Sequence, residues 1–275
     1  MTGVAVLPTV PSPTVVSVVV VQLIAADSAA VLQPLVGGLS AATPIQTAVS
    51  DWAFVWENRW YLLSGAGLTV TLTITSLLVG FLAGFPAGVI ETYGEGRLAS
   101  LVTAVGVVLR GTPIVVILIV AFFVLPTPDL RLFALEVSGG FVAGTLGLGL
   151  RSAAYQSQIF RGALRSVDDG QLEAARAVGM SRLEAIRHVA VPQALRRSVP
   201  GFQNEVTIVL KDTSVVFAIG LSELLTRSYD LFVRQTTAVL EVILFASLIY
   251  FVLTFGTNRA LDYAERRFSI PEGNA

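Results

Sequence analysis

Residues 62–90 read LLSGAGLTVTLTITSLLVGFLAGFPAGVI and contain no charged side chain. A transmembrane α-helix needs about 20 consecutive, mostly apolar residues, so this stretch is long enough to cross a membrane. The whole chain has the same character, because 54% of its 275 residues are hydrophobic and only 13% are charged. Soluble domains carry about 25% charged residues. The composition and the mean hydropathy of +0.75 therefore predict that lipid surrounds much of the protein surface.

Four further stretches have the length and apolar character of membrane helices. Arg110-Gly111-Thr112-Pro113 interrupts the first of them, and Glu241 lies in the last. The sequence therefore predicts an all-α membrane protein with five core transmembrane helices. Besides residues 62–90, the predicted spans cover residues 99–125, 137–159, 199–221 and 238–261.

The basic residues are distributed unevenly between the two sides of these five spans. If residue 60 lies outside, eleven of the 18 basic residues fall in segments that face the cytoplasm. The outer segments hold four, namely Arg59, Arg131, Arg227 and Arg234. Cytoplasmic loops are enriched in Lys and Arg. This bias predicts that the N-terminal side of the five-helix core lies outside and that the C-terminus lies inside.

Residues 1–57 differ from the rest, since no Lys or Arg precedes Arg59. A secretory signal peptide has a basic start, so the apolar run from Thr14 to Ala26 favours an extra membrane helix over a signal sequence. A disordered or surface-lying segment is the alternative. The predicted organisation is an N-terminal extension over 1–57, a membrane domain over 58–267 and a tail over 268–275.

The polar stretch between the third and fourth spans, residues 160–198, is too long for a simple turn. Residues 171–178 have a helical pattern that Gly179 interrupts. Ser181 followed by Glu184 matches a capping box, the signature of a helix start. This second helix is expected over 181–191 and is expected to end at Pro192.

Within this loop, Glu173-Ala174-Ala175, Gly179 and Pro192 resemble the EAA signature of ABC importer permeases. Val189 and Val191 stand where Ile and Leu are usual in that family, and both changes are conservative. The resemblance implies the type I ABC importer permease fold. It also implies that the first short helix docks on a cytoplasmic ATPase subunit and that these five signature residues couple the two subunits.

Other matches narrow the resemblance, which extends from about Gly67 to Arg267, to the polar amino-acid permeases of the histidine and glutamine type. They are residues 110–113 (RGTP), 161–163 (RGA), 192–196 (PQALR) and 210–214 (LKDTS). Gln158 departs from the family, which usually has Glu there. The resemblance implies a multi-pass protein of the cytoplasmic membrane. The implied partners are an ATPase, an extracytoplasmic amino-acid-binding protein and a second permease chain, identical or paralogous.

Charged and polar residues inside the spans are candidates for the substrate pathway, because such groups normally face a cavity or a partner. Arginine matches the carboxylate of an amino acid bidentately, and an acidic side chain matches its ammonium. Arg151 and Glu205 are expected to pair across the third and fourth spans. Structural ion pairs and snorkelling are the alternative reading. The candidates are Arg110, Thr112, Arg151, Glu205, Lys211, Asp212, Thr213 and Ser214.

Several functions are excluded or disfavoured by missing motifs. Lys211, the only lysine, is followed by Asp, so the chain has no phosphate-binding G-x-x-x-x-G-K-[ST] motif, and ATP hydrolysis is expected on a separate subunit. With no Cys and only His188, no metal site, cofactor or enzymatic cluster is expected. No nucleic-acid partner is expected. The rival function is a secondary transporter or channel for small polar solutes, for which no internal repeat is evident.

Overall fold

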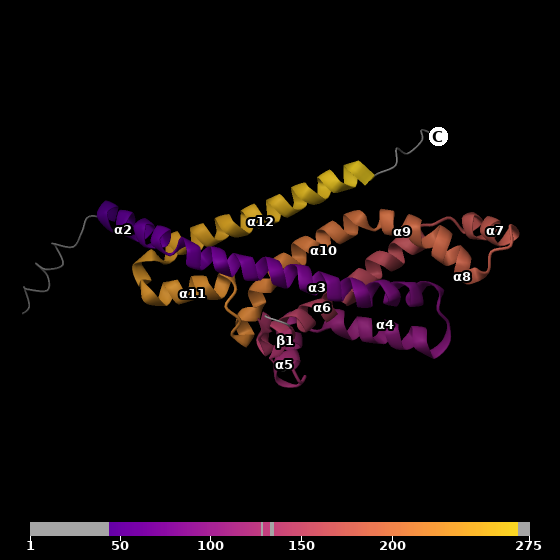
Figure 1. Ribbon diagram of the computed structural model, residues 1–275, viewed down its shortest axis with the longest axis horizontal. Coiled ribbons are helices and arrows are strands. Elements are labelled where there is room, and N and C mark those ends of the chain that lie inside the picture. Colours follow the sequence, from indigo (N-terminus) through magenta and orange to yellow (C-terminus); the bar gives the residue numbers. More distant parts are fainter. Residues whose placement is uncertain (1–43, 128, 133–134, 269–275) are drawn as a thin grey trace, which may run out of the picture. The chain divides into compact units, whose positions relative to one another are not determined.

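A computed structural model describes residues 44–127, 129–132 and 135–268 (Figure 1). The chain divides into two compact units, residues 1–50 and 51–275. The described part of the first unit is the start of helix α2 (Pro44–Glu57). The prediction of a membrane helix between Thr14 and Ala26 lies outside the described residues.

The second unit is almost entirely helical. Its elements, after the end of α2, are α3 (Arg59–Tyr93), α4 (Gly96–Gly111), α5 (Ile114–Phe123), β1 (Leu130–Leu132), β2 (Leu135–Val137), α6 (Gly139–Arg165), α7 (Asp169–Ala177), α8 (Arg182–Ala185), the π-helix η1 (Ile186–Ala190), α9 (Val191–Arg197), α10 (Val199–Asp212), the 3₁₀-helix η2 (Thr213–Ile219), α11 (Leu224–Arg234), the 3₁₀-helix η3 (Thr236–Ala238) and α12 (Val239–Phe268).

The predicted all-α membrane fold is confirmed. Within the described residues, two helical stretches, α3 and Thr236–Tyr263, are each long and apolar enough to cross a membrane, and the bent pair α4–α5 is a third if it forms one span. The third predicted span is α6, which is less apolar. The fourth is α10 continued by η2, which ends at Gly220 in the left-handed region (φ +72°). One addition was not predicted, an antiparallel pair of short strands, β1 and β2, between α5 and α6.

The predicted interruption of the second span is a sharp bend, with α4 and α5 inclined at 107°. Pro113 causes it, because a residue before proline is driven out of the helical region. Thr112 accordingly has an extended backbone (φ −92°, ψ 132°), and its hydroxyl donates to the carbonyl of Val108 at 2.8 Å. Arg110 therefore lies in the last turn of α4, directly before the bend.

Helices α3 and α6 pack very closely, and three glycines of α3 make this contact. Gly80, Gly84 and Gly88 follow one another at intervals of four residues, so they share one face of the helix. A Cβ atom on Gly84 would lie 2.6 Å from the carbonyl oxygen of Ala153, and one on Gly88 would lie 2.8 Å from that of Ser157. Small residues at such positions allow membrane helices to approach.

Replacing Gly84 with alanine is therefore expected to destabilise the protein by about 1–3 kcal/mol, the usual cost of overpacking a core. Gly67→Ala is the matched control on the same helix, because no atom lies within 4 Å of the Cβ position there. Thermal unfolding of both variants in detergent measures the difference. Equal melting temperatures for the two variants would contradict the close contact between α3 and α6.

Four apolar clusters form the core of the described part of the chain, and two of them join the membrane helices most widely. One joins α3, α5, α6 and η2 through Leu72, Leu118, Leu148 and Val216, none of which is more than 1% exposed. The other joins α2, α3, α11 and α12. The glycine-rich start of α6 also packs closely, since a Cβ on Gly147 would lie 2.9 Å from Cδ2 of Leu118.

The prediction that a helix ends at Pro192 is wrong. The chain stays helical from Arg182 through η1 and α9 to Arg197. Proline has no N–H and its ring clashes with the carbonyl four residues earlier. The π-helix before it adds a residue to the turn, and the N–H of Val191 bonds to the carbonyl of Ile186, five residues back. A widened turn of this kind accommodates the proline without breaking the helix.

Candidate functional site

The polar loop (residues 160–198) is fixed to the ends of α3 and α6. Small and apolar side chains of the loop pack against Val89 and Tyr93 of α3. Arg182 donates to the carbonyl oxygen of Tyr93 at 3.1 Å, and Arg197 donates to that of Ser166. A displacement of the loop is therefore transmitted to these two helices. The packed loop residues are Ala163, Leu164, Val167, Ala190 and Ala194.

Gly179 ends α7 and turns the chain toward α8. Its φ of +97° lies in the region that side-chain-bearing residues avoid. The N–H of Gly179 bonds to the carbonyl of Arg176 at 3.0 Å, and that of Met180 bonds to the carbonyl of Ala175 at 3.1 Å. This pair of bonds is a Schellman motif, which usually has glycine at this position. The sequence-predicted break at Gly179 is thus confirmed, with a defined geometry.

The predicted capping box at the start of α8 is confirmed as well. Glu184 accepts hydrogen bonds from the backbone N–H of Ser181 at 2.8 Å and from its hydroxyl at 2.7 Å. The backbone bond, followed by the hydroxyl bond, lowers the pKa of Glu184. The carboxylate is therefore charged at neutral pH and holds the turn after Gly179.

The outward side of α7 and α8 combines polar and apolar groups. Glu173 and Ala174 are exposed, whereas Ala175 is buried against the loop. Val178 and Leu183 are 79% and 74% exposed. Residues of α7, the turn and α8 line a cavity of about 640 Å³. Four of the five predicted coupling residues therefore lie together, and Pro192 lies apart at the start of α9.

A second polar group lies between α6 and α10. Arg151 forms an ion pair with Asp212, and its guanidinium lies 4.9 Å from the ring centre of Tyr155. Glu205 is 3% exposed and accepts a hydrogen bond from the hydroxyl of Ser152 at 2.7 Å. The predicted Arg151–Glu205 pair is therefore wrong. Both residues do bridge these two helices, but each has another partner.

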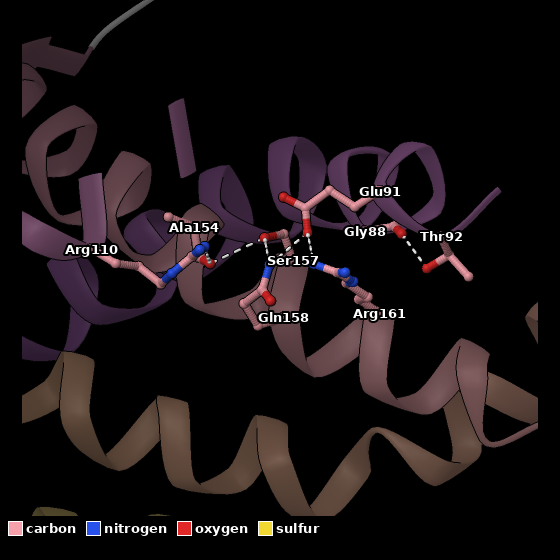
Figure 2. A network of polar contacts seen from close by, with 8 residues as sticks. All are labelled: Gly88, Glu91, Thr92, Arg110, Ala154, Ser157, Gln158 and Arg161. Atoms are coloured by element: carbon pink, nitrogen blue, oxygen red, sulfur yellow. Dashed lines mark hydrogen bonds and ion pairs between the residues drawn. The ribbon is translucent and has the colours of Figure 1, made fainter. Parts of the chain in front are cut away.

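Figure 2 shows a third polar group, between α3, α4 and α6. Arg110 donates to the carbonyl of Ala154 on α6 at 2.8 Å. Glu91 of α3 accepts from the Gln158 amide at 2.5 Å and lies 3.7 Å from the guanidinium of Arg161. Gln158 thus contacts a carboxylate supplied by the neighbouring helix. This network ties the end of α3 to α6 beside the polar loop.

Lys211 and Ser214 line a cavity of about 500 Å³ on the side of α10 and η2 that faces α12. Among the described residues, no carboxylate lies within ion-pair distance of Lys211. Thr213 is buried, and its hydroxyl donates to the carbonyl of Leu210 at 2.7 Å. The other lining residues are Leu225, Ser247, Tyr250, Phe251 and Thr254.

Sequence reasoning did not single out Glu223, although it is completely buried. Its carboxylate accepts from the N–H groups of Leu225 and Thr226, both at 2.8 Å, and from the Tyr250 hydroxyl at 3.0 Å. It therefore caps α11 and binds it to α12. The sequence does show that Glu223 is an acidic residue directly before a helical pattern, which indicates a helix cap. Its burial could not be predicted in the same way, because it depends on α12.

Comparisons with known proteins agree on one kind of protein. The glutamine transport system permease protein GlnP of Escherichia coli (strain K12) is 35% identical over 223 residues, covering 80% of this chain and 98% of that protein. The probable amino-acid permease protein YxeN of Bacillus subtilis (strain 168) is 36% identical over 163 residues, covering 59% of this chain and 70% of that protein.

A solved amino acid ABC transporter with histidines is structurally similar, with a TM-score of 0.66 and 30% sequence identity over 78% of this chain and 98% of that one. The MetNI methionine ABC transporter, at 21% identity and a TM-score of 0.59, shares the fold. A family model described as "Binding-protein-dependent transport system inner membrane component" matches residues 76–270. The chain belongs to this family of ABC importer permease subunits.

Proposed function

We propose that this permease subunit carries polar amino acids across the cytoplasmic membrane, with ATP hydrolysed on a partner subunit docked on the polar loop. The observation that carries the proposal is the exposed surface of α7 and α8. Val178 and Leu183 are exposed beside Glu173 in an otherwise polar segment, and exposed apolar groups with a polar rim are typical of protein contacts. The loop behind them is anchored to α3 and α6.

The same proposal covers the orientation and the assembly. The excess of arginine in the loops on one side supports an N-terminal side of the core that faces outward and a C-terminus inside. Residues 58–267 form the permease domain. A second permease chain completes the pathway, and an extracytoplasmic binding protein delivers the substrate. Names of similar proteins that refer to glutamine and other amino acids support this substrate class.

We assign the pathway to the polar groups that converge on α10. The cavity at Lys211 and Ser214 offers an ammonium that has no carboxylate partner among the described residues and that suits a substrate carboxylate. The Ser214 hydroxyl donates to the carbonyl of Lys211 at 2.8 Å. The Arg151–Asp212 pair lies on α6 and α10. Glu205 lies on α10 as well, seven residues before Asp212. The remaining candidates, Arg110, Thr112 and Thr213, bond mainly to backbone carbonyls, which supports a role in shaping the helices around the pathway.

Reconstitution tests the proposal. The chain is purified with its ATPase, placed in liposomes and supplied with its binding protein and labelled glutamine. Uptake is expected only with ATP, and a hydrolysis-deficient ATPase is expected to stop it. Uptake at the full rate without any ATPase would identify a secondary transporter or channel instead and would overturn the proposal.

A further inference from the structure

All three tryptophans of the chain lie within nine residues, at the junction of α2 and α3. Trp52, Trp56 and Trp60 follow one another at intervals of four residues and therefore share one side of the helices. They are 45%, 62% and 68% exposed. We call this surface the tryptophan face.

The opposite side of the same segment is anchored in the protein. Val55 and Leu62 are buried in the cluster that includes residues of α11 and α12. The buried Asp51 accepts hydrogen bonds from the side chains of Gln235 at 2.6 Å and Thr237 at 2.9 Å. The outward direction of the tryptophans is therefore set by the fold.

A cation lies within the tryptophan face. The guanidinium of Arg59 is 4.7 Å from the ring centre of Trp56 and 5.6 Å from a ring centre of Trp60. It also donates to the carbonyl of Trp56 at 2.6 Å. Among the described residues, no carboxylate lies within ion-pair distance of Arg59. The face thus combines three amphipathic rings with a cation that has no anionic partner in the described part of the chain.

We propose that the tryptophan face is a lipid-binding surface that lies in the headgroup layer and fixes the depth of α3 in the membrane. The uncharged stretch of α3 begins at Trp60, directly after Arg59, and runs to Ile90, which places Trp60 at the boundary of the hydrocarbon. Tryptophan is enriched at this boundary because its ring is apolar while its N–H is polar. Arg59 is complementary in charge to lipid phosphate.

The depth of each tryptophan follows from the helix geometry. Eight residues separate Trp52 from Trp60, about 12 Å along the helix. The headgroup layer is about 5–8 Å thick on each side of the bilayer. This distance exceeds the thickness of the layer, so Trp60 is the deepest of the three at the inner boundary, Trp56 lies within the layer and Trp52 is the shallowest, at its outer edge. This inference rests on membership of a membrane family and is independent of the transported substrate.

Because the chain contains only three tryptophans, variants with a single tryptophan can test the proposal by fluorescence. Three single-tryptophan variants of the full chain carry Phe at the other two positions and are placed in phosphatidylcholine membranes. The lipid is brominated either near the carbonyl or near the end of its acyl chains. We expect fluorescence quenching by shallow bromine to exceed quenching by deep bromine for all three, and to be strongest for Trp60 and weakest for Trp52.

Two controls calibrate depth in a background with all three tryptophans replaced by Phe. Leu82→Trp, at a 72% exposed site in the middle of α3, should respond mainly to deep bromine. Val178→Trp in the polar loop should respond mainly to aqueous iodide. The proposal is overturned if the tryptophan face behaves like either control. It is equally overturned if no quencher reaches the face, since a protein partner then covers it.

Discussion

Replacing Gly179 with valine is expected to abolish ATP-driven uptake, although the permease still folds and enters the membrane. The φ of +97° costs an L-residue about 1–2 kcal/mol, and a β-branched side chain tolerates it worst. To relieve this strain, the turn must give up the hydrogen bonds from Gly179 and Met180 that end α7. Helix α7 then points elsewhere and Glu173 no longer reaches the ATPase.

Uptake by proteoliposomes and co-purification of the ATPase measure the effect together. Gly96→Val is the matched control, because Gly96 also has a positive φ (+74°) and open space around its Cβ position, but is the first residue of α4, outside the polar loop. We expect this variant to suffer similar strain and to keep most of its uptake. Normal uptake and ATPase association in Gly179→Val would remove the coupling role from this turn.

The features that the sequence predicted correctly are those determined by neighbouring residues. The spans at α3 and α12 follow from long apolar runs, the bend after Gly111 follows from Pro113, and the start of α8 follows from Ser181 and Glu184. In each case the physical cause lies within a few residues of its effect. The family resemblance added the proposed coupling role of the polar loop, which local rules alone could not predict and which stays a prediction.

The errors concern choices that the local sequence leaves open. Pro192 can end a helix or sit after a π-helix, and the packing of Ala190 and Ala194 against the membrane helices favours the second. The predicted partner of Arg151 was wrong because two acidic residues, Glu205 and Asp212, lie on the same helix and either could pair with it. Only the register of α6 against α10, where a Cβ on Gly201 would lie 2.8 Å from Cγ2 of Ile159, decides between them. Glu223 was missed because α12 buries it from a distance in sequence.

Replacing Arg151 with methionine is expected to destabilise the permease by about 3 kcal/mol. The side chains of Arg151 and Asp212 are only 19% and 23% exposed. Removing the cation leaves the Asp212 carboxylate without compensation in a region of low polarity, and breaking such a pair typically costs about 3–5 kcal/mol. Thermal unfolding measures the loss. Arg97→Met, at an exposed position near the start of α4, is the control and should change stability little.

The double variant Arg151→Met with Asp212→Asn separates support of the fold from contact with the substrate. Both charges are removed together, so no uncompensated ion remains and most of the stability should return. Uptake by the double variant then shows whether the charges of Arg151 and Asp212 contact the transported amino acid. Because both residues belong to the polar group between α6 and α10 that we assign to the pathway, we expect uptake of labelled glutamine to stay impaired in the stable double variant. Recovery of both stability and uptake would make the pair purely structural and would leave Lys211 and Ser214 as the groups that face the substrate.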